Sequence, residues 1–239
     1  MKRALVTGGN SPIGTAICQE LTSMGFHVLV HGHQHQELCE DVTRQLIERG
    51  GSAESICCDL TDSTTTEHSM NKILENGPIQ VIVHNAGIYA DAPLAGMTTQ
   101  QWHQVIDVSL HGFFHVTQPL LLPMIRTRWG RIITISSLSG MIGHRGQTNY
   151  SAAKSGLHGA TRSLATEVAS RGITVNVVAP GLIQSPSTEN AFTVEQIESM
   201  VPMKRVGQPE EVASVVGFLA SEKASYLSGQ IIGVNGAMA

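Results

Sequence analysis

The sequence is poor in aromatic residues and carries no excess of positive charge. Phe, Trp and Tyr together make up 4% of its 239 residues, too few to suggest a platform on which nucleic-acid bases could stack. The formal net charge is −4 at pH 7, whereas broad binding of nucleic acids or anionic membranes needs a basic face. No apolar run is long enough to cross a membrane, and Met1–Arg3 leads directly into strand residues without the apolar stretch of a leader peptide. We therefore expect neither nucleic acid nor membrane among its partners.

Cysteine is also scarce. The four cysteines are Cys18, Cys39, Cys57 and Cys58, and no pair has the spacing of a zinc site. Cys57 and Cys58 are neighbours in an expected strand, so their side chains point to opposite faces. We interpret all four as reduced thiols of a cytoplasmic protein.

Histidine, in contrast, is plentiful, with 11 residues. His31, His33 and His35 alternate, so a strand would place them on one side, which is one way to begin a metal site. No other histidine, cysteine or carboxylate group converges on them in the sequence, and we expect no metal.

Apolar strands alternate strictly with amphipathic helices along the chain. The strands read as continuous apolar runs, which predicts a parallel sheet covered by helices on both faces. No linker, low-complexity stretch or repeat divides residues 1–239, so we predict a single α/β domain with a doubly wound, seven-stranded parallel sheet. The expected strands are residues 4–7, 26–30, 53–58, 80–84, 130–137, 173–178 and 230–234. The expected helices are residues 15–24, 36–49, 63–76, 98–126 (kinked or interrupted at Pro119 and Pro123), about 149–170, and 209–220.

A glycine-rich turn, Gly8–Gly14, connects the first strand to the first helix. Such a turn lets the backbone approach a pyrophosphate, and the helix N-terminus supplies N–H donors. A plain tight turn in an α/β protein would have a similar sequence. Ligands of doubly wound sheets bind beyond the carboxyl ends of the strands. Small or polar residues stand at those ends: Gly8–Gly14, Gly32, His33, Asp59, Asn85–Gly87, Ser137, Pro180 and Gly181.

The segment after the second strand bears on the choice of dinucleotide. An acidic residue there would select NAD through the ribose 2′-hydroxyl, but residues 31–35 contain no carboxylate. This favours NADP(H) over NAD(H). The basic partner for a 2′-phosphate is not obvious, because the histidines are only partly charged near neutral pH. Asp59, at the end of the third strand, could accept a hydrogen bond from an adenine amino group.

Tyr150 and Lys154 lie four residues apart, so a helix places both on one face. An ammonium near a phenol favours the phenolate and lowers its pKa, which suits acid–base chemistry near neutral pH. Ser137, at the end of the expected fifth strand, could complete a proton-transfer site. A surface tyrosine–lysine pair beside a serine-rich loop is the other interpretation of these residues.

Several motifs stand in order along the chain: the turn from Thr7 to Gly14, Asn85–Gly87, Ser137, Tyr150 with Lys154, and Pro180 with Gly181. Together they resemble the short-chain dehydrogenase/reductase family. The resemblance covers nearly the whole chain. It is greatest to the 3-oxoacyl-(acyl-carrier-protein) reductases, and the segments that carry this likeness are residues 130–135, 167–181 and 234–236.

The resemblance implies a Rossmann-type fold and NADPH-dependent reduction of a 3-oxoacyl chain to the 3-hydroxyacyl form, in fatty-acid, polyketide or polyene-type biosynthesis. Tyr150 would donate a proton to the substrate oxygen, Lys154 would lower the pKa of Tyr150 and bind the nicotinamide ribose, and Ser137 would hydrogen-bond the oxygen. The implied cofactor contacts are Gly8, Asn10, Ser11, Ile13, Gly14, Gly32, His33, Asp59, Leu60, Asn85, Ala86, Gly87, Tyr150, Lys154, Pro180, Gly181, Ile183 and Ser185.

The resemblance also implies a partner and an assembly. Arg128 and Arg171 match positions that dock an acidic acyl carrier protein, although solvated surface charge would explain both arginines equally well. Residues 182–206 correspond to an apolar substrate lid, for which an ordinary amphipathic helix is the alternative. The family predicts a homotetramer, or an assembly that includes another protein of a ketosynthase pathway.

Four positions depart from the family pattern. Pro12 replaces the middle glycine of the turn, although proline is well tolerated at the start of a helix. Ser109 stands where an asparagine completes a proton relay behind Lys154, His84 replaces the first residue of Asn-Asn-Ala-Gly, and Ser11 replaces a basic residue. Pro12 and Ser109 keep open the alternative of a non-catalytic dinucleotide-binding subunit. A further alternative is a reductase or dehydrogenase of a free small alcohol, sugar or steroid, from which a role of Arg128 and Arg171 in carrier docking would distinguish this protein.

Overall fold

Seven parallel strands form one sheet at the centre of the molecule. The computed structural model describes the backbone of residues 1–239 and all side chains except those of residues 187, 189 and 190. The strand order is β3-β2-β1-β4-β5-β6-β7, and each neighbouring pair is parallel, as the sequence predicts. The strands are β1 (Arg3–Thr7), β2 (His27–Gly32), β3 (Ser52–Cys57), β4 (Val81–His84), β5 (Gly130–Ile135), β6 (Ile173–Pro180) and β7 (Ile231–Val234).

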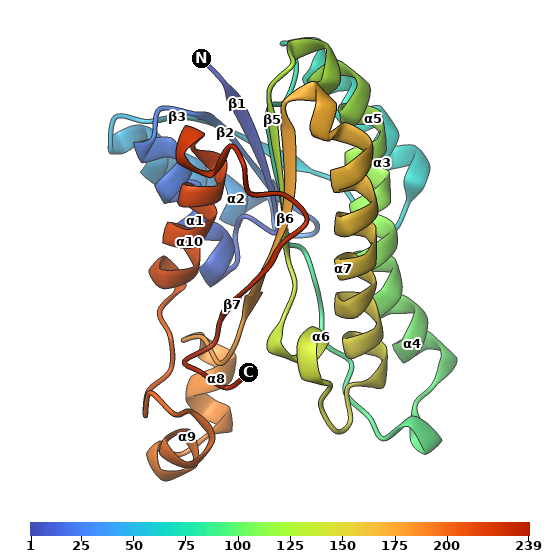
Figure 1. Cartoon of the computed structure of the whole chain (residues 1–239), viewed down its shortest axis with the longest axis vertical. Helices are drawn as coiled ribbons and strands as arrows, with labels where there is room; N and C mark the ends of the chain where they lie inside the picture. The colour runs from blue at the N-terminus through green and yellow to red at the C-terminus, as the bar shows by residue number, and fades with distance from the viewer.

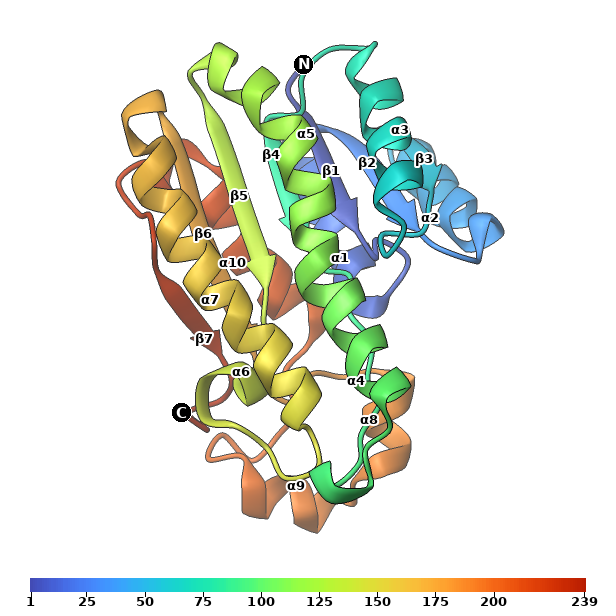
Figure 2. The ribbon, with the colours of Figure 1, turned by 90° about the vertical axis from the view of Figure 1, so that its right-hand side faces the viewer.

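Helices cover both faces of the sheet (Figure 1). One layer contains α1 (Pro12–Ser23), α2 (Gln36–Glu48) and α10 (Pro209–Ala220). The other contains α3 (Ser63–Leu74), α4 (Thr99–Ile106), α5 (Gly112–Thr127) and α7 (Thr148–Val168). The short helices α6 (Leu138–Ile142), α8 (Pro186–Ala191) and α9 (Val194–Met200) lie beyond the carboxyl ends of the strands (Figure 2). Within the part of the chain that the structure describes, no helix is both long and apolar enough to cross a membrane.

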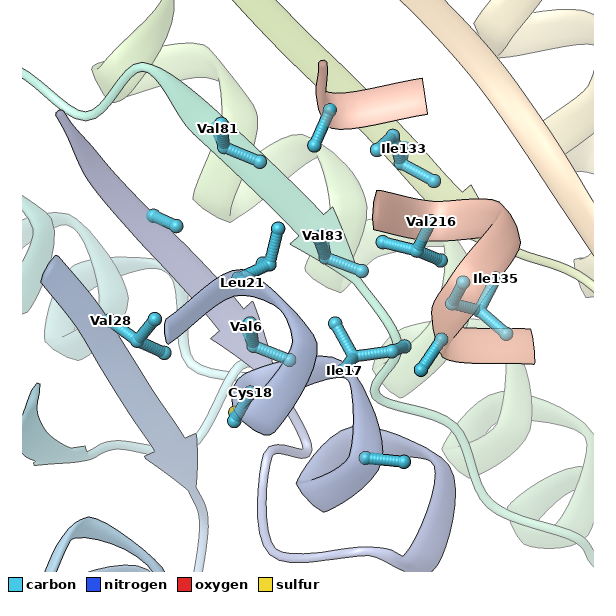
Figure 3. Packing of buried hydrophobic residues seen from close by; sticks show 14 of the residues in the cluster. Val6, Ile17, Cys18, Leu21, Val28, Val81, Val83, Ile133, Ile135 and Val216 are labelled. Atoms are coloured by element: carbon cyan, nitrogen blue, oxygen red, sulfur yellow. The ribbon is translucent and has the colours of Figure 1, made fainter. Parts of the chain in front are cut away.

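Each face of the sheet packs its own hydrophobic core. Neighbouring strand residues point to opposite faces, so Val6 of β1 joins the core under α1 and α10, whereas Leu5 joins the core under α5. Figure 3 shows Val6 beside Ile17 of α1, and Val83 of β4 beside Val216 of α10. Burial on both faces explains why the strands read as continuous apolar runs.

The prediction of a single helix over residues 98–126 that breaks at its prolines is wrong in one respect. α5 runs through Pro119 and Pro123 without interruption, and the break lies earlier, at the π-helical turn η2 (Asp107–His111). Leu120 and Met124 of α5 are fully buried, and this packing holds the helix together across the missing proline donors.

The order of the strands reverses between β1 and β4, because β2 lies on one side of β1 and β4 lies on the other. The connections from β1 and β4 therefore leave to opposite sides of the sheet and open a crevice at their carboxyl ends. Gly8 and Asn85, which follow these two strands, stand on its two walls.

Candidate active site

The glycine turn forms a cradle at the start of α1. Gly8 has a φ of 61°, in the left-handed region that suits glycine, and a Cβ at Gly14 would overlap the Gly8 carbonyl oxygen. Ser11 caps the helix: its hydroxyl accepts from the Gly14 N–H at 3.1 Å and donates to the Gly8 carbonyl at 2.8 Å. Pro12 takes the first helical position, as its chemistry allows.

This cradle fits a dinucleotide pyrophosphate. The first amides of a helix have no carbonyl acceptor one turn back, and the positive end of the helix dipole adds to their attraction for anions. Ile13 lies in this first turn, and both Ile13 and Ser11 line a cavity. The absence of a Cβ at Gly8 and Gly14 lets the backbone of the turn fold tightly at the start of α1.

Asn85 holds the turn in place, a role that the sequence did not reveal. Its side-chain amide donates to the Gly8 carbonyl at 2.9 Å and to the Thr7 carbonyl at 3.1 Å. The Thr7 hydroxyl in turn accepts from the backbone N–H groups of Asn85 and Ala86, both at 3.0 Å. The ends of β1 and β4 are thereby fastened together on either side of the crevice.

The end of β2 forms the far part of the crevice. Gly32 is pressed against the Cys39 thiol, and Asn10 lies beside it. The His33 Nε2 lies 3.4 Å from Asp59 Oδ2, and Thr61 N–H donates to Asp59 Oδ1 at 2.9 Å. These contacts leave His33 and Asp59 together at the edge where the adenosine is expected.

The three alternating histidines do not share a strand face. β2 ends at Gly32, and His35 already precedes α2. His31 is buried and donates from Nε2 to the Cys58 carbonyl at 3.1 Å. Among the residues whose side chains are described, no group of three or more His, Cys, Asp or Glu could hold a metal ion.

Ser137, Tyr150 and Lys154 come together at the ends of β5 and α7. Ser137 caps α6 and its side chain hydrogen-bonds Tyr150. Lys154 donates to the Ile135 carbonyl at 2.9 Å, and its Nζ lies 5.6 Å from the centre of the Tyr150 ring. Tyr150 and Lys154 are 6% and 2% exposed, so the interpretation as a surface pair is wrong.

A cavity of about 500 Å³ joins this trio to the glycine turn. The residues of both halves that line it include Ser11, Ile13, Asn85, Ser137, Tyr150 and Lys154. Gly87 also lines the cavity, and a Cβ there would lie 2.9 Å from the Lys154 ammonium. A dinucleotide on the turn would therefore extend its second half toward Tyr150.

Burial sets the electrostatics of the site. It lowers the pKa of Lys154 from 10.5 to about 8. Burial also raises the pKa of Tyr150 well above its usual range; Tyr89 adds to this rise, and the hydrogen bond with Ser137 opposes it. Burial therefore determines the net pKa of Tyr150 in this state of the site, and the lowering of that pKa by Lys154 stays a prediction. The raised value keeps the phenol protonated at neutral pH, which is the form that can donate a proton.

Tyr89 is a neighbour of the site that no sequence pattern selects. Its ring lies 4.7 Å from the Tyr150 ring, tilted by 36°, although 66% of Tyr89 is exposed. The only signal in the sequence is its place two residues after Gly87. Gln147, which precedes α7, donates to Asp91 at 2.8 Å and completes the rim.

The segment after β6 closes the other side of the cavity. The Gly181 N–H donates to the Val234 carbonyl at 2.9 Å, which fixes Pro180–Gly181 to β7. Ile183 is buried and Ser185 caps α8; both line the cavity. Leu60, in contrast, buries its side chain in the core, so a contact of Leu60 with a dinucleotide would use its backbone.

The expected lid is only partly apolar toward the cavity. Met200 lines the cavity and Val201 is buried, whereas Val194 and Met203 are 66% and 63% exposed. The alternative, an amphipathic helix packed on the core, does not fit Val194 either, because that apolar side chain is exposed. The lid interpretation stays a prediction, supported by Leu182, Ile183 and Met200, which line the cavity.

Ser109 and the two arginines occupy very different places. Ser109 lies in η2, fully buried behind Gly87 and Lys154. Arg128 ends α5 and Arg171 lies in η3 (Ala169–Arg171), just before β5 and β6. They are thus at the opposite end of α7 from Tyr150, roughly 30 Å away at 1.5 Å per residue.

The fold and the site together define an oxidoreductase that uses a nicotinamide dinucleotide. A family model described as "Enoyl-(Acyl carrier protein) reductase" matches residues 8–238. The 3-oxoacyl-[acyl-carrier-protein] reductase FabG of Aggregatibacter actinomycetemcomitans is 41% identical over 236 residues, which cover 98% of this chain and 98% of that protein. Reductases of the same name from Staphylococcus aureus (strain N315) and Pseudomonas aeruginosa are each 40% identical, over 99% of this chain and 98% and 97% of theirs. The chain belongs to the short-chain dehydrogenase/reductase family and is an NAD(P)-dependent oxidoreductase.

Proposed function

We propose that the protein reduces a 3-oxoacyl chain, carried as a thioester on an acyl carrier protein, to the 3-hydroxyacyl form with NADPH. The observation that carries this proposal is the single cavity in which Tyr150, Ser137 and Lys154 face the glycine turn. The relatives named above are 3-oxoacyl-[acyl-carrier-protein] reductases, and their similarity to this chain extends over nearly their whole length. Fatty-acid biosynthesis is the corresponding pathway, and polyketide or polyene-type synthesis needs the same reaction.

Each residue of the trio has one task in this reaction. The residues around the glycine turn would hold a nicotinamide dinucleotide, which would supply the hydride for the carbonyl carbon. Tyr150 gives its hydroxyl proton to the carbonyl oxygen, so that the ketone gains one hydride and one proton. Ser137 donates a hydrogen bond to the same oxygen and stabilises the charge that develops on it. Lys154, one turn along α7, favours departure of the Tyr150 proton through its own positive charge.

The choice of NADPH rests on the end of β2. Residues 31–35 offer no carboxylate to a ribose 2′-hydroxyl, and His33 is half-exposed at the place where a 2′-phosphate would lie. A protonated His33 attracts that phosphate. NADH is the alternative, and competition between the two dinucleotides in a binding titration decides between them.

Carrier docking by Arg128 and Arg171 requires a second subunit. Within one subunit, α7 separates these arginines from Tyr150 by its whole length. If two subunits pack α5 and α7 antiparallel, the arginines of one come beside the active site of the other. Phe114 and Leu122 of α5 are 62% and 56% exposed, an apolar surface that such pairing would cover. A homotetramer built on this pair is our proposal for the assembly.

The test follows NADPH absorbance with a 3-oxoacyl thioester, both free and attached to an acyl carrier protein. We expect wild-type protein to oxidise NADPH, and Tyr150→Phe to lose at least about 100-fold in kcat. Arg128→Glu and Arg171→Glu should slow only the carrier-bound substrate. Three results would contradict the proposal. Reduction of an enoyl thioester alone would favour an enoyl reductase, and reduction of a small free ketone alone would favour a small-molecule reductase. Reduction of no substrate at all would favour a non-catalytic subunit.

A further inference from the structure

Tyr89 lies beside the proposed proton donor, and the proposed reaction gives it no task. Of the 3 tyrosines in the chain, two meet here: the ring centres of Tyr89 and Tyr150 lie 4.7 Å apart, with the ring planes tilted by 36°. Both residues line the cavity, but Tyr150 is buried whereas Tyr89 is mostly exposed. An aromatic ring that lines a cavity and keeps most of its surface free is typical of a contact for a ligand.

The irregular segment that follows β4 carries Tyr89 and is fastened to the start of α7. The Ala92 N–H donates to the Gly146 carbonyl at 2.9 Å, and the Gln147 side chain donates to Asp91 at 2.8 Å. Both partners immediately precede α7. The segment is therefore held against the helix that carries the proton donor, although it has no secondary structure of its own.

Asn149 joins this segment to Tyr150 itself. Its side chain is fully buried, and its amide donates to the Ala90 carbonyl at 3.0 Å and to the Gln101 carbonyl at 2.9 Å. Its side-chain oxygen accepts from the backbone N–H of Tyr150 at 2.8 Å. One buried amide thus links the residue after Tyr89 to the backbone of Tyr150, so the separation of the two rings is determined by the backbone on both sides.

The Tyr150 hydroxyl has two neighbouring hydroxyls, those of Ser137 and Tyr89, and both side chains hydrogen-bond it. The two neighbours come from different connections, because Ser137 follows β5 and Tyr89 lies in the segment after β4. In the proposed reaction the substrate oxygen accepts from Tyr150 and from Ser137. The carbon atoms that flank the reacting carbonyl then lie between the two connections, with the ring of Tyr89 on one side.

We propose that Tyr89 is a specificity-determining residue: its fixed ring is one wall of the substrate subsite, which admits a 3-oxoacyl chain that is unbranched beside the carbonyl and excludes one that carries a branch on the side of the ring. Exclusion of this kind is steric, since a methyl group there would meet a ring whose backbone is held in place. The inference rests on the proposed function, because the position of the chain follows from Tyr150 as the proton donor.

The test measures kcat/KM with NADPH for three free thioesters: 3-oxopentanoyl, its 2-methyl analogue and its 4-methyl analogue. Wild-type protein should reduce at least one methyl analogue about tenfold less efficiently than the unbranched compound. Tyr89→Ala should raise kcat/KM for that analogue at least about fivefold without raising it for the unbranched compound. Tyr89→Phe should keep the wild-type ratio, because it keeps the ring. Intrinsic differences in reactivity between the thioesters cancel when variants are compared.

A matched control removes the third tyrosine. Tyr226 is fully exposed and lies outside the cavity, so Tyr226→Ala should leave all three values of kcat/KM unchanged. Tyr89→Ala and Tyr226→Ala should both keep the wild-type melting temperature, since each removes an exposed ring. A change of the ratio in Tyr89→Ala at an unchanged melting temperature then reports on the subsite and not on the stability of the fold.

Three results would overturn the inference: no gain for either methyl analogue in Tyr89→Ala, an equal change for branched and unbranched compounds, or a loss of selectivity in Tyr89→Phe as large as in Tyr89→Ala. The last result would assign the selectivity to the hydroxyl instead of the ring. Failure of the proposed function is distinguishable from all three, because wild-type protein would then leave the unbranched 3-oxopentanoyl thioester unreduced.

Discussion

Replacing Lys154 with methionine should stabilise the protein while it abolishes turnover. The lysine is 2% exposed, and burial lowers its pKa from 10.5 to about 8. That change corresponds to a penalty of roughly 3 kcal/mol on the charged form in the folded state. Methionine has a similar length and no charge, so Lys154→Met removes the penalty at pH 7.

One contact opposes this gain. Lys154 donates to the Ile135 carbonyl at 2.9 Å, and losing that hydrogen bond costs about 1 kcal/mol. The net expectation at pH 7 is therefore a rise of about 2 kcal/mol in the free energy of unfolding.

The pH dependence carries the sharper test. Between pH 8 and 10.5 the unfolded chain still binds a proton on Lys154 and the folded chain does not, so wild-type stability gains from this group as pH rises. The advantage of Lys154→Met should thus shrink by about 3 kcal/mol across this window and change sign within it, at about pH 9.5.

The assay is denaturant unfolding of both proteins without dinucleotide, at equal concentrations, at pH 7, 9 and 10.5. Other titrating groups are common to both proteins and cancel in the difference. A variant that is less stable at pH 7, or a difference that does not change with pH, would refute the assignment of the penalty to Lys154.

Three further predictions follow from the same geometry. Gly14→Ala should weaken NADPH binding more than tenfold in a fluorescence titration, since its Cβ overlaps the Gly8 carbonyl, whereas Gly96→Ala, with nothing near its Cβ, should bind normally; equal affinities would contradict the cradle. The kcat for reduction should fall as pH rises through about 8, where Lys154 loses its charge; a kcat that stays level to pH 10 would exclude that dependence. Ser109→Ala should raise the free energy of unfolding by about 1 kcal/mol, because it removes a buried hydroxyl that lacks a partner; a loss of stability in denaturant unfolding would show that the hydroxyl is satisfied.

The alternation of apolar runs was sufficient to predict seven parallel strands, because burial on both faces of a sheet leaves a direct signature in composition. The trio was also predictable: Tyr150 and Lys154 share a helical face by spacing, and Ser137 follows a strand whose carboxyl end must lie at the same edge. These inferences depend on local pattern and on one rule of topology, and both are contained in short stretches of sequence.

What escaped prediction depends on contacts between distant segments. The amide of Asn85 fastens a turn 77 residues earlier in the chain, and the ring of Tyr89 meets Tyr150 only after α7 is docked. The break of the long helix at η2 rather than at Pro119 has the same origin, because tertiary packing of α5 outweighs the local preference of proline.

Two unfavourable groups of the interior lie together beside the candidate active site, and this explains why the fold retains them. Lys154 carries a buried charge and Ser109 a buried hydroxyl without a partner, and each lowers stability where an apolar residue would raise it. Both adjoin Gly87, between the glycine turn and the phenol of Tyr150. Two destabilising groups beside a candidate active site are what selection for activity at the expense of stability leaves behind. Stabilising substitutions elsewhere in the core should therefore leave turnover intact. Substitutions at Lys154 and Ser109, in contrast, should raise stability only at the expense of turnover.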